Sequence, residues 1–173
     1  MSRFLSLCFL LCFVNFSSFA NEVSKSKIKI IKECKAWKVI DNGDGSLSAV
    51  SFPTKQNGTY SKREQPYVAV TKFAGSSELE VSFHFGFTLK RGSEVPLTIH
   101  PNCNNTENSP VFYLTTQDQN SWARTDEDDV KIIKQFSGSC KAKVKANSTR
   151  NTYSEDEYSL SGFSDCIKLI STN

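Results

Sequence analysis

The sequence predicts an antiparallel β-sandwich that carries two short helices. Three observations support this fold class: about seven short apolar segments are separated by turn signals, the clearest segment alternates apolar with polar residues, and helical periodicity occurs at only two places. With 173 residues, 38% of them hydrophobic and 23% charged, the chain is long enough to form one core. The composition excludes a disordered chain and a collagen-like repeat.

Residues 1–20 are organised as a secretory signal peptide. Arg3 precedes an apolar run over residues 4–14, and the small residues Ser18 and Ala20 stand where a signal peptidase reads its −3 and −1 positions. We therefore expect cleavage near Ala20 and a mature chain that starts at Asn21.

Two alternatives for this segment are less favoured. The apolar run is shorter than the ~20 residues needed to cross a bilayer, which disfavours an uncleaved anchor. A lipid anchor at Cys8 or Cys12 needs a small residue directly before the cysteine, but Leu7 and Leu11 occupy these positions. Because no later stretch is apolar enough to span a membrane, we expect a periplasmic or secreted protein without a transmembrane segment.

The first elements of the mature chain are short strands. The lysine-rich segment 21–34 is expected to be frayed or to lie at a sheet edge, and a polar loop is expected over 53–66. Pro96 lacks an amide donor, so its strand is also placed at an edge. The expected strands are 36–40, 46–52, 67–73, 79–85, 95–99, 111–116, 140–146 and a last one around Tyr158 and Leu160.

The cleanest strand signal lies at 79–85, where apolar residues alternate with polar ones. This period indicates a strand that covers a core with one face only. Trp37 in the first strand and two apolar residues near the C-terminus are assigned to the same core. The predicted core residues are Trp37, Leu79, Val81, Phe83, Phe85, Leu160 and Phe163.

Helical signals occur twice. Thr125 and the acids at 126–129 resemble a capping box, and Gly138 ends the apolar pattern, which predicts a helix over 126–137. Contiguous acids without a glycine do not fit a calcium loop, so we interpret them as negative charge at a helix start. One face of a second, C-terminal helix carries Phe163, Cys166, Ile167 and Ile170.

Cleavage would leave four of the six cysteines in an oxidising compartment. The cysteines show no CxxC spacing and have no histidine near them in the sequence, which disfavours a metal site and favours disulfides. Four cysteines allow three pairings. We expect Cys140 to pair with Cys166, because both lie on apolar faces of their elements. Cys34 and Cys103 are paired by elimination.

The sequence contains no catalytic or cofactor motif. His84 and His100 lie on expected strands, away from any nucleophile pattern, and are interpreted as solvent-facing. Neither a G-x-S-x-G elbow nor a paired-carboxylate pattern can be placed, which disfavours an exported hydrolase. We therefore predict no enzyme activity, no catalytic, cofactor or metal site, and no small-molecule substrate.

Lysines supply the one candidate ligand surface. The formal net charge of +3 is too small to indicate nucleic acid, and no aromatic series accompanies the basic residues. Lys141, Lys143 and Lys145 share one face of an expected strand and could bind an anionic polymer. The alternative is that the lysines protect exposed strands from edge-to-edge aggregation.

Several short motifs follow one another in a characteristic order. They lie at 80–86, 92–95, 112–115, 121–123 and 148–163, the last containing Ser-x-Arg-x-Thr and Ser-Leu-x-Gly-Phe segments. Together with Trp37 and 49–53, this set resembles the invasion-associated locus B (IalB) family of exported Gram-negative proteins, over roughly residues 35–170. Asn151 stands where the family has glycine, and the family's cysteine before Ala49 is absent, so no family disulfide is carried over.

The resemblance implies an immunoglobulin-like β-sandwich, an envelope location and, in pathogenic members, a link to host-cell invasion and virulence. It implies no catalytic residue. On this basis the chain divides into a signal peptide (1–20), a lysine-rich segment (21–34) and an IalB-like domain (35–173).

The function expected from this is that of an exported, non-enzymatic envelope protein that supports invasion or envelope integrity. Its expected partners are envelope components or the host-cell surface. The alternative is a secreted module that binds an anionic host or envelope polymer through its lysines.

Overall fold

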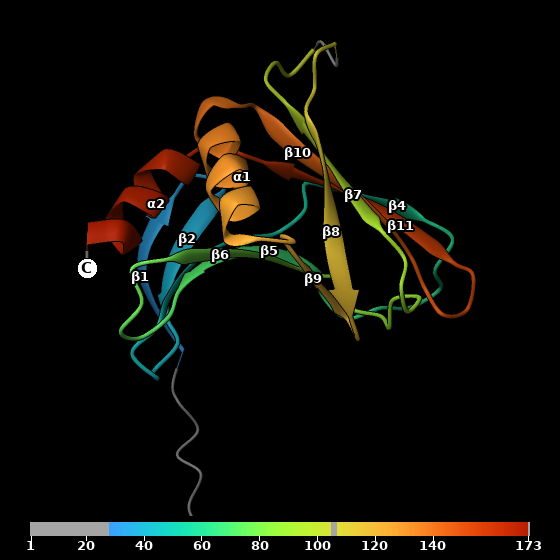
Figure 1. Cartoon of the computed structure of the whole chain (residues 1–173), viewed down its shortest axis with the longest axis horizontal. Coiled ribbons are helices and arrows are strands. Elements are labelled where there is room, and N and C mark those ends of the chain that lie inside the picture. Colours follow the sequence, from blue (N-terminus) through green and yellow to red (C-terminus); the bar gives the residue numbers. More distant parts are fainter. Residues whose placement is uncertain (1–27, 105–106, 173) are drawn as a thin grey trace, which may run out of the picture.

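The computed structural model describes residues 28–104 and 107–172, and there it forms an antiparallel β-sandwich with two helices (Figure 1). The predicted fold class is thereby confirmed, with one helix in mid-chain and one at the C-terminus. The predicted signal peptide and residues 21–27 lie outside the described residues.

One half of the sandwich, here called sheet A, has the strand order β1-β2-β3-β5-β6-β9, and the other half, sheet B, has the order β7-β10-β11-β4. Strand β8 joins them, because residues 115–117 pair with β9 whereas 111–114 pair with β7. The strands are β1 (Lys29–Cys34), β2 (Trp37–Asp41), β3 (Leu47–Ser51), β4 (Lys55–Gly58), β5 (Tyr67–Lys72), β6 (Leu79–His84), β7 (Val95–His100), β8 (Val111–Gln117), β9 (Asn120–Trp122), β10 (Lys141–Asn147) and β11 (Tyr153–Ser159).

Strand β7 is central, so the edge position predicted from Pro96 is wrong. The amide of Ile99 bonds to the carbonyl of Pro110, on the β8 side. Because amides alternate in direction along a strand, the missing donor of Pro96 faces β10 instead. There the pairing of the two strands ends at Val144 and Leu97, one residue short of Pro96, so no ladder bond is lost.

The core lies between the two sheets and under the helices. Trp37, Val81, Phe83, Phe85 and Phe163 are fully buried, as predicted. Leu160 is also buried, whereas Leu79 is only half-buried at the start of β6. The Trp37 ring meets the Phe163 ring edge-on at 4.8 Å and donates its indole N–H to the carbonyl of Ser159, 2.9 Å away. Trp37 therefore joins sheet A to the end of β11.

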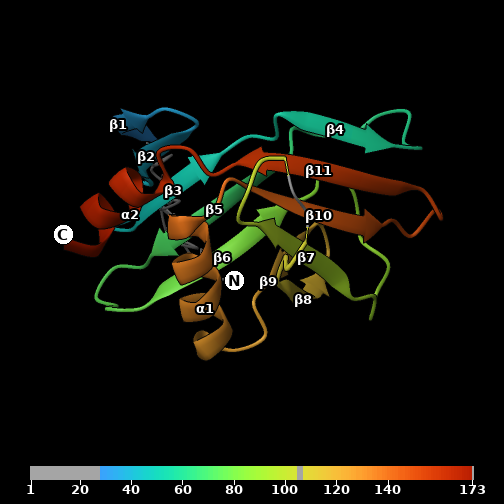
Figure 2. The same ribbon diagram turned by 90° about the horizontal axis from the view of Figure 1, so that it is seen from above.

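Helices α1 (Asp126–Gly138) and α2 (Phe163–Thr172) both cover the inner side of sheet A (Figure 2). Thr125 caps α1 by accepting a hydrogen bond from the amide of Asp128, in agreement with the capping interpretation. The face of α2 predicted to be apolar is the buried one.

The predicted disulfide pairing is wrong. Cys34 pairs with Cys166, and Cys103 pairs with Cys140. Helix α2 packs on β1, β2 and β3 of sheet A rather than over the start of β10, and so brings Cys166 to the end of β1. Cys140 lies beside the end of β7, where its amide bonds to the carbonyl of His100, close to the loop that carries Cys103.

A buried ion pair fastens the 59–66 loop to β11. The side chains of Arg63 and Asp156 are 3% and 0% exposed, and Arg63 Nη1 donates to Asp156 Oδ2 at 2.9 Å. Burial raises the pKa of Asp156, while the hydrogen bonds and charge of Arg63 lower it. Because an unpaired buried charge is costly, this pair fixes the position of the loop.

Candidate binding surface

The outer face of sheet A, turned away from sheet B and from both helices, carries a groove with a volume of about 720 Å³. Figure 1 shows α1 and α2 together on the other side of this sheet. The groove crosses β1, β2, β3, β5 and β6, whose alternate residues point outward. Its apolar lining includes Ile30, Ile40, Val50, Phe52, Tyr67 and Phe73.

Small side chains form the floor of this groove. In one row across the sheet Ser48 of β3 stands opposite Thr71 of β5, and in the next row Ala69 stands opposite Ser82 of β6. The hydroxyls of Ser48 and Thr71 bond to each other at 2.8 Å, and Asn42 donates a further bond to Ser48. The floor is therefore low, and the hydroxyls of Ser48 and Thr71 are satisfied within it, while the larger residues around it stand higher.

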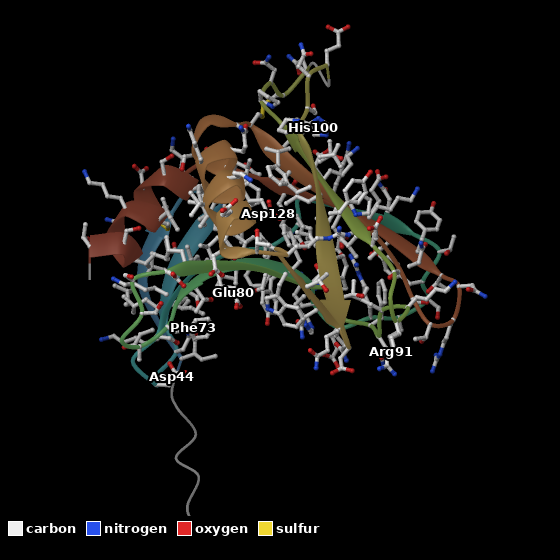
Figure 3. The ribbon with its side chains drawn as sticks, viewed as in Figure 1. Asp44, Phe73, Glu80, Arg91, His100 and Asp128 are labelled. Carbon is white, nitrogen blue, oxygen red and sulfur yellow. A yellow bond between two sulfur atoms is a disulfide. The ribbon has the colours of Figure 1, made fainter. Side chains whose placement is uncertain are left out.

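A second hollow, of about 680 Å³, lies between α1 and the β5–β6 turn. Phe73 and Glu80 line both hollows, so the two meet at the end of β5 (Figure 3). Val130 and Ile133 of α1 supply its other apolar wall. Phe73 is 49% exposed although it is among the largest apolar residues of the chain.

The combined surface carries an excess of acids. Glu78, Asp126 and Glu127 line the second hollow, and Asp44 lies at the rim of the groove. Hydrogen bonds from Ser46 lower the pKa of Asp44, which keeps it ionised at neutral pH. Burial raises the pKa of Glu80, and a hydrogen bond from Trp122 opposes that rise. Of the nearby cations, Lys38 is paired with Glu33 at 2.7 Å, Lys131 lies 3.8 Å from Glu127, and Lys134 lines the second hollow, so they offset part of the negative charge.

Asp129 is the buried acid of this region. Its Oδ1 accepts a hydrogen bond from the amide of Val81 at 2.6 Å, at a point of β6 beyond the reach of β9. Burial, with the neighbouring charges of Glu80, Asp126 and Asp128, raises the pKa of Asp129 to about 6. Since its bond satisfies a backbone donor, Asp129 anchors α1 to sheet A.

The predicted basic surface of β10 is largely neutralised by β11. Lys141 lies 3.2 Å from Glu157, and Lys143 lies 3.5 Å from Glu155. The ammonium group of Lys145 lies over the Tyr153 ring, 5.2 Å from its centroid. Lysines of one strand thus face acids of the next, and the alternation of Glu155 and Glu157 in the sequence is the signal that indicates this pairing.

The two histidines lie apart and have different environments. His84 points outward from β6, stacks on Tyr67 at 4.9 Å and bonds to Asn120. His100 is buried, contrary to the solvent-facing interpretation, and its Nδ1 lies 2.8 Å from the hydroxyl of Ser109. Burial and the charge of Lys141 lower the pKa of His100. Neither histidine adjoins the groove's acids closely enough to form an ion pair with them.

Within residues 28–104 and 107–172, no group of three or more His, Cys, Asp or Glu is placed to hold a metal ion. In the same part of the chain, no helix has the length and apolar character to span a membrane. Comparisons with family models, curated proteins and solved structures find no match. The resemblance to the IalB family therefore stays a prediction.

Proposed function

We propose that the protein is an exported, non-enzymatic envelope protein that binds a polypeptide partner along the outer face of sheet A. The observation that carries this proposal is the gathering of Ile28, Ile30, Phe52 and Phe73, each about half exposed or more, around one groove. Contiguous apolar surface of this kind is typical of interaction sites. The two disulfides support an oxidising compartment.

The charge of the surface indicates the chemistry of the partner. Exposed carboxylates of Asp44, Glu78 and Glu127 surround apolar side chains, so a segment with apolar and basic residues would match both. We propose that this segment belongs to an envelope or host-cell component. Binding it would give this protein the supporting role in invasion or envelope integrity that the IalB resemblance implies.

A pair of model peptides tests the groove. One alternates leucine with lysine, the other leucine with glutamate, and binding of each is followed by fluorescence anisotropy. We expect the lysine peptide to bind the mature protein and the glutamate peptide not to bind, because the groove is acidic. Phe52→Ser/Phe73→Ser is expected to weaken binding of the lysine peptide at least tenfold, since it removes two apolar anchors.

The matched control is Val111→Ser/Tyr113→Ser on β8. These two residues are 47% and 50% exposed, against 48% and 49% for Phe52 and Phe73, so the control removes equally exposed apolar groups from another face. Equal binding by the groove variant and the β8 variant would contradict the proposal, as would equal binding of the two peptides.

A further inference from the structure

The end of the sandwich away from α2 holds a third hollow, of about 290 Å³. It lies where the 59–66 loop, the β6–β7 loop, the β8–β9 turn and the β10–β11 hairpin meet. Backbone hydrogen bonds join these loops: the amide of Thr149 bonds to the carbonyl of Thr88, and the amide of Leu89 to the carbonyl of Asp118. The hollow is near the lower limit of about 300 Å³ for small-ligand sites, which suits one compact chemical unit.

Cations gather at this end and lack acidic partners. Lys62 and Arg150 line the hollow, and Lys90 and Arg91 follow Thr88 on the β6–β7 loop. Figure 3 labels Arg91 at this end of the molecule. All four are exposed, and none forms an ion pair with any residue that the structure describes.

The acids on these loops leave that positive charge largely uncompensated. Glu64 lies 3.8 Å from His84, and Glu94 is paired with Arg124. Asp118, in the β8–β9 turn, is the remaining acid. Fixed positive charge around a concave surface attracts anions.

The two cations of the hollow are held on ordered backbone. The Ser148 hydroxyl accepts hydrogen bonds from the amides of Arg150 and Thr152, and Asn151 adopts a φ of 58°, so the hairpin turn has one defined shape. Lys62 precedes Arg63, whose buried pair with Asp156 fixes its loop. The Ser-x-Arg-x-Thr segment thus builds the turn that presents Arg150.

The remaining lining suits a ligand that carries hydroxyl groups. The hydroxyls of Ser61, Thr88 and Thr149 form no hydrogen bond with any described residue. Tyr60 and Phe87, both half-buried, add apolar surface.

We infer that this hollow binds one acidic unit of a saccharide, a sugar that bears a sulfate, phosphate or carboxylate group. The anionic group lies between Lys62 and Arg150, where the guanidinium can bond to two oxygens at once. Sugar hydroxyls bond with the hydroxyls of Ser61, Thr88 and Thr149, and the apolar side of the ring lies against Tyr60 and Phe87. This site is separate from the proposed polypeptide groove and shares no lining residue with it.

The test uses three probes at one ionic strength: a sulfated heparin disaccharide, an uncharged disaccharide, which should not bind because it lacks the anionic group, and sodium sulfate alone, which should bind more weakly. Binding is measured by calorimetry and located by amide NMR shifts. We expect the sulfated disaccharide to bind, to shift the amides of 60–63, 87–90, 118–119 and 148–152, and to weaken as salt rises. Lys62→Gln/Arg150→Gln is expected to weaken it at least tenfold.

The control, Lys29→Gln/Lys168→Gln, removes the same charge from two exposed sites outside the hollow and should keep full affinity. Equal loss in both double variants would overturn the site, since overall charge would then account for binding. Sodium sulfate that binds as tightly as the disaccharide would overturn the saccharide assignment, and shifts elsewhere on the surface would overturn the location. The Phe52→Ser/Phe73→Ser variant should bind the disaccharide normally, so this test and that of the groove fail independently.

Discussion

A single carboxylate fastens helix α1 to sheet A, and its protonation links the stability of the fold to pH. Asp129 is 7% exposed and has a pKa of about 6, above its ordinary value of 3.8. The folded state therefore holds this proton more tightly than the unfolded chain. The stabilising contribution is complete below about pH 4 and is lost as the pH rises through about 6.

Asp129→Asn keeps an oxygen that can accept the Val81 amide but cannot ionise. The difference between pKa 3.8 and about 6 corresponds to about 3 kcal/mol. We expect the free energy of unfolding of the variant, relative to the unaltered protein, to rise by most of that amount, about 2 kcal/mol, between pH 4 and pH 7. Chemical denaturation at the two pH values measures it. A pH-independent difference for Asp129→Asn would refute the assignment.

Residues whose position depends on a distant partner were beyond prediction from the sequence. Alternation located Val81 and Phe83 in the core, because period-2 hydrophobicity is a local property. Trp37 was assigned there from its place in the first expected strand and from the family resemblance. Arg63 and Asp156 are 93 residues apart and become a buried pair only when the loop crosses β11. Nothing near either residue in the sequence distinguishes it from an exposed charge.

At the scale of elements, the strands with apolar alternation were predictable and the polar ones were not. Strand β4 lies within the expected 53–66 loop, since its exposed Lys55, Gln56 and Asn57 carry no core-facing pattern. Strand β9 is only three residues long. The groove also escaped prediction, because its floor combines Ser48, Ala69 and Ser82 from three strands whose pairing the sequence does not specify.

Helix α2 is tied to β1 by the Cys34–Cys166 disulfide and by close packing at its start. Gly162 has a φ of 88°, and a Cβ there would lie 1.8 Å from the carbonyl oxygen of Cys34. The disulfide spans 132 residues, against 37 for Cys103–Cys140, so in the chain-entropy model its loss costs about 1 kcal/mol more.

We expect Cys34→Ser/Cys166→Ser to lower the free energy of unfolding by about 2–5 kcal/mol and to raise hydrogen exchange throughout α2. Cys103→Ser/Cys140→Ser serves as the comparison and should leave α2 protected, with faster exchange confined to the β7–β8 loop. Hydrogen exchange followed by mass spectrometry measures both. If hydrogen exchange in α2 rose equally in the two variants, the Cys34–Cys166 disulfide would not be what stabilises the helix.

At the scale of the whole molecule, export is the property from which the other proposals follow. We expect the mature protein to start at Asn21 and to carry both disulfides, because its four remaining cysteines are paired in the fold. Intact mass of the protein recovered from fractionated cells measures the start and the loss of four hydrogen atoms together. A chain that keeps residues 1–20, or that has free thiols in every cell fraction, would contradict export.

The pairing of β4 with β11 sets the order in which the molecule can be completed. Residue 55 of β4 finds its partner at 157, and Cys34 finds its own at 166. Since synthesis proceeds from the N-terminus, β4 exists for most of the chain's emergence without its strand partner, and β1, although it can pair with β2 early, exists without the helix to which Cys34 is bonded. Such long-range contacts make folding slow, and a nascent chain of this kind stays unfinished until its last residues are free. The fold is therefore suited to a polypeptide that is delivered unfolded and matures only after it has been released as a whole.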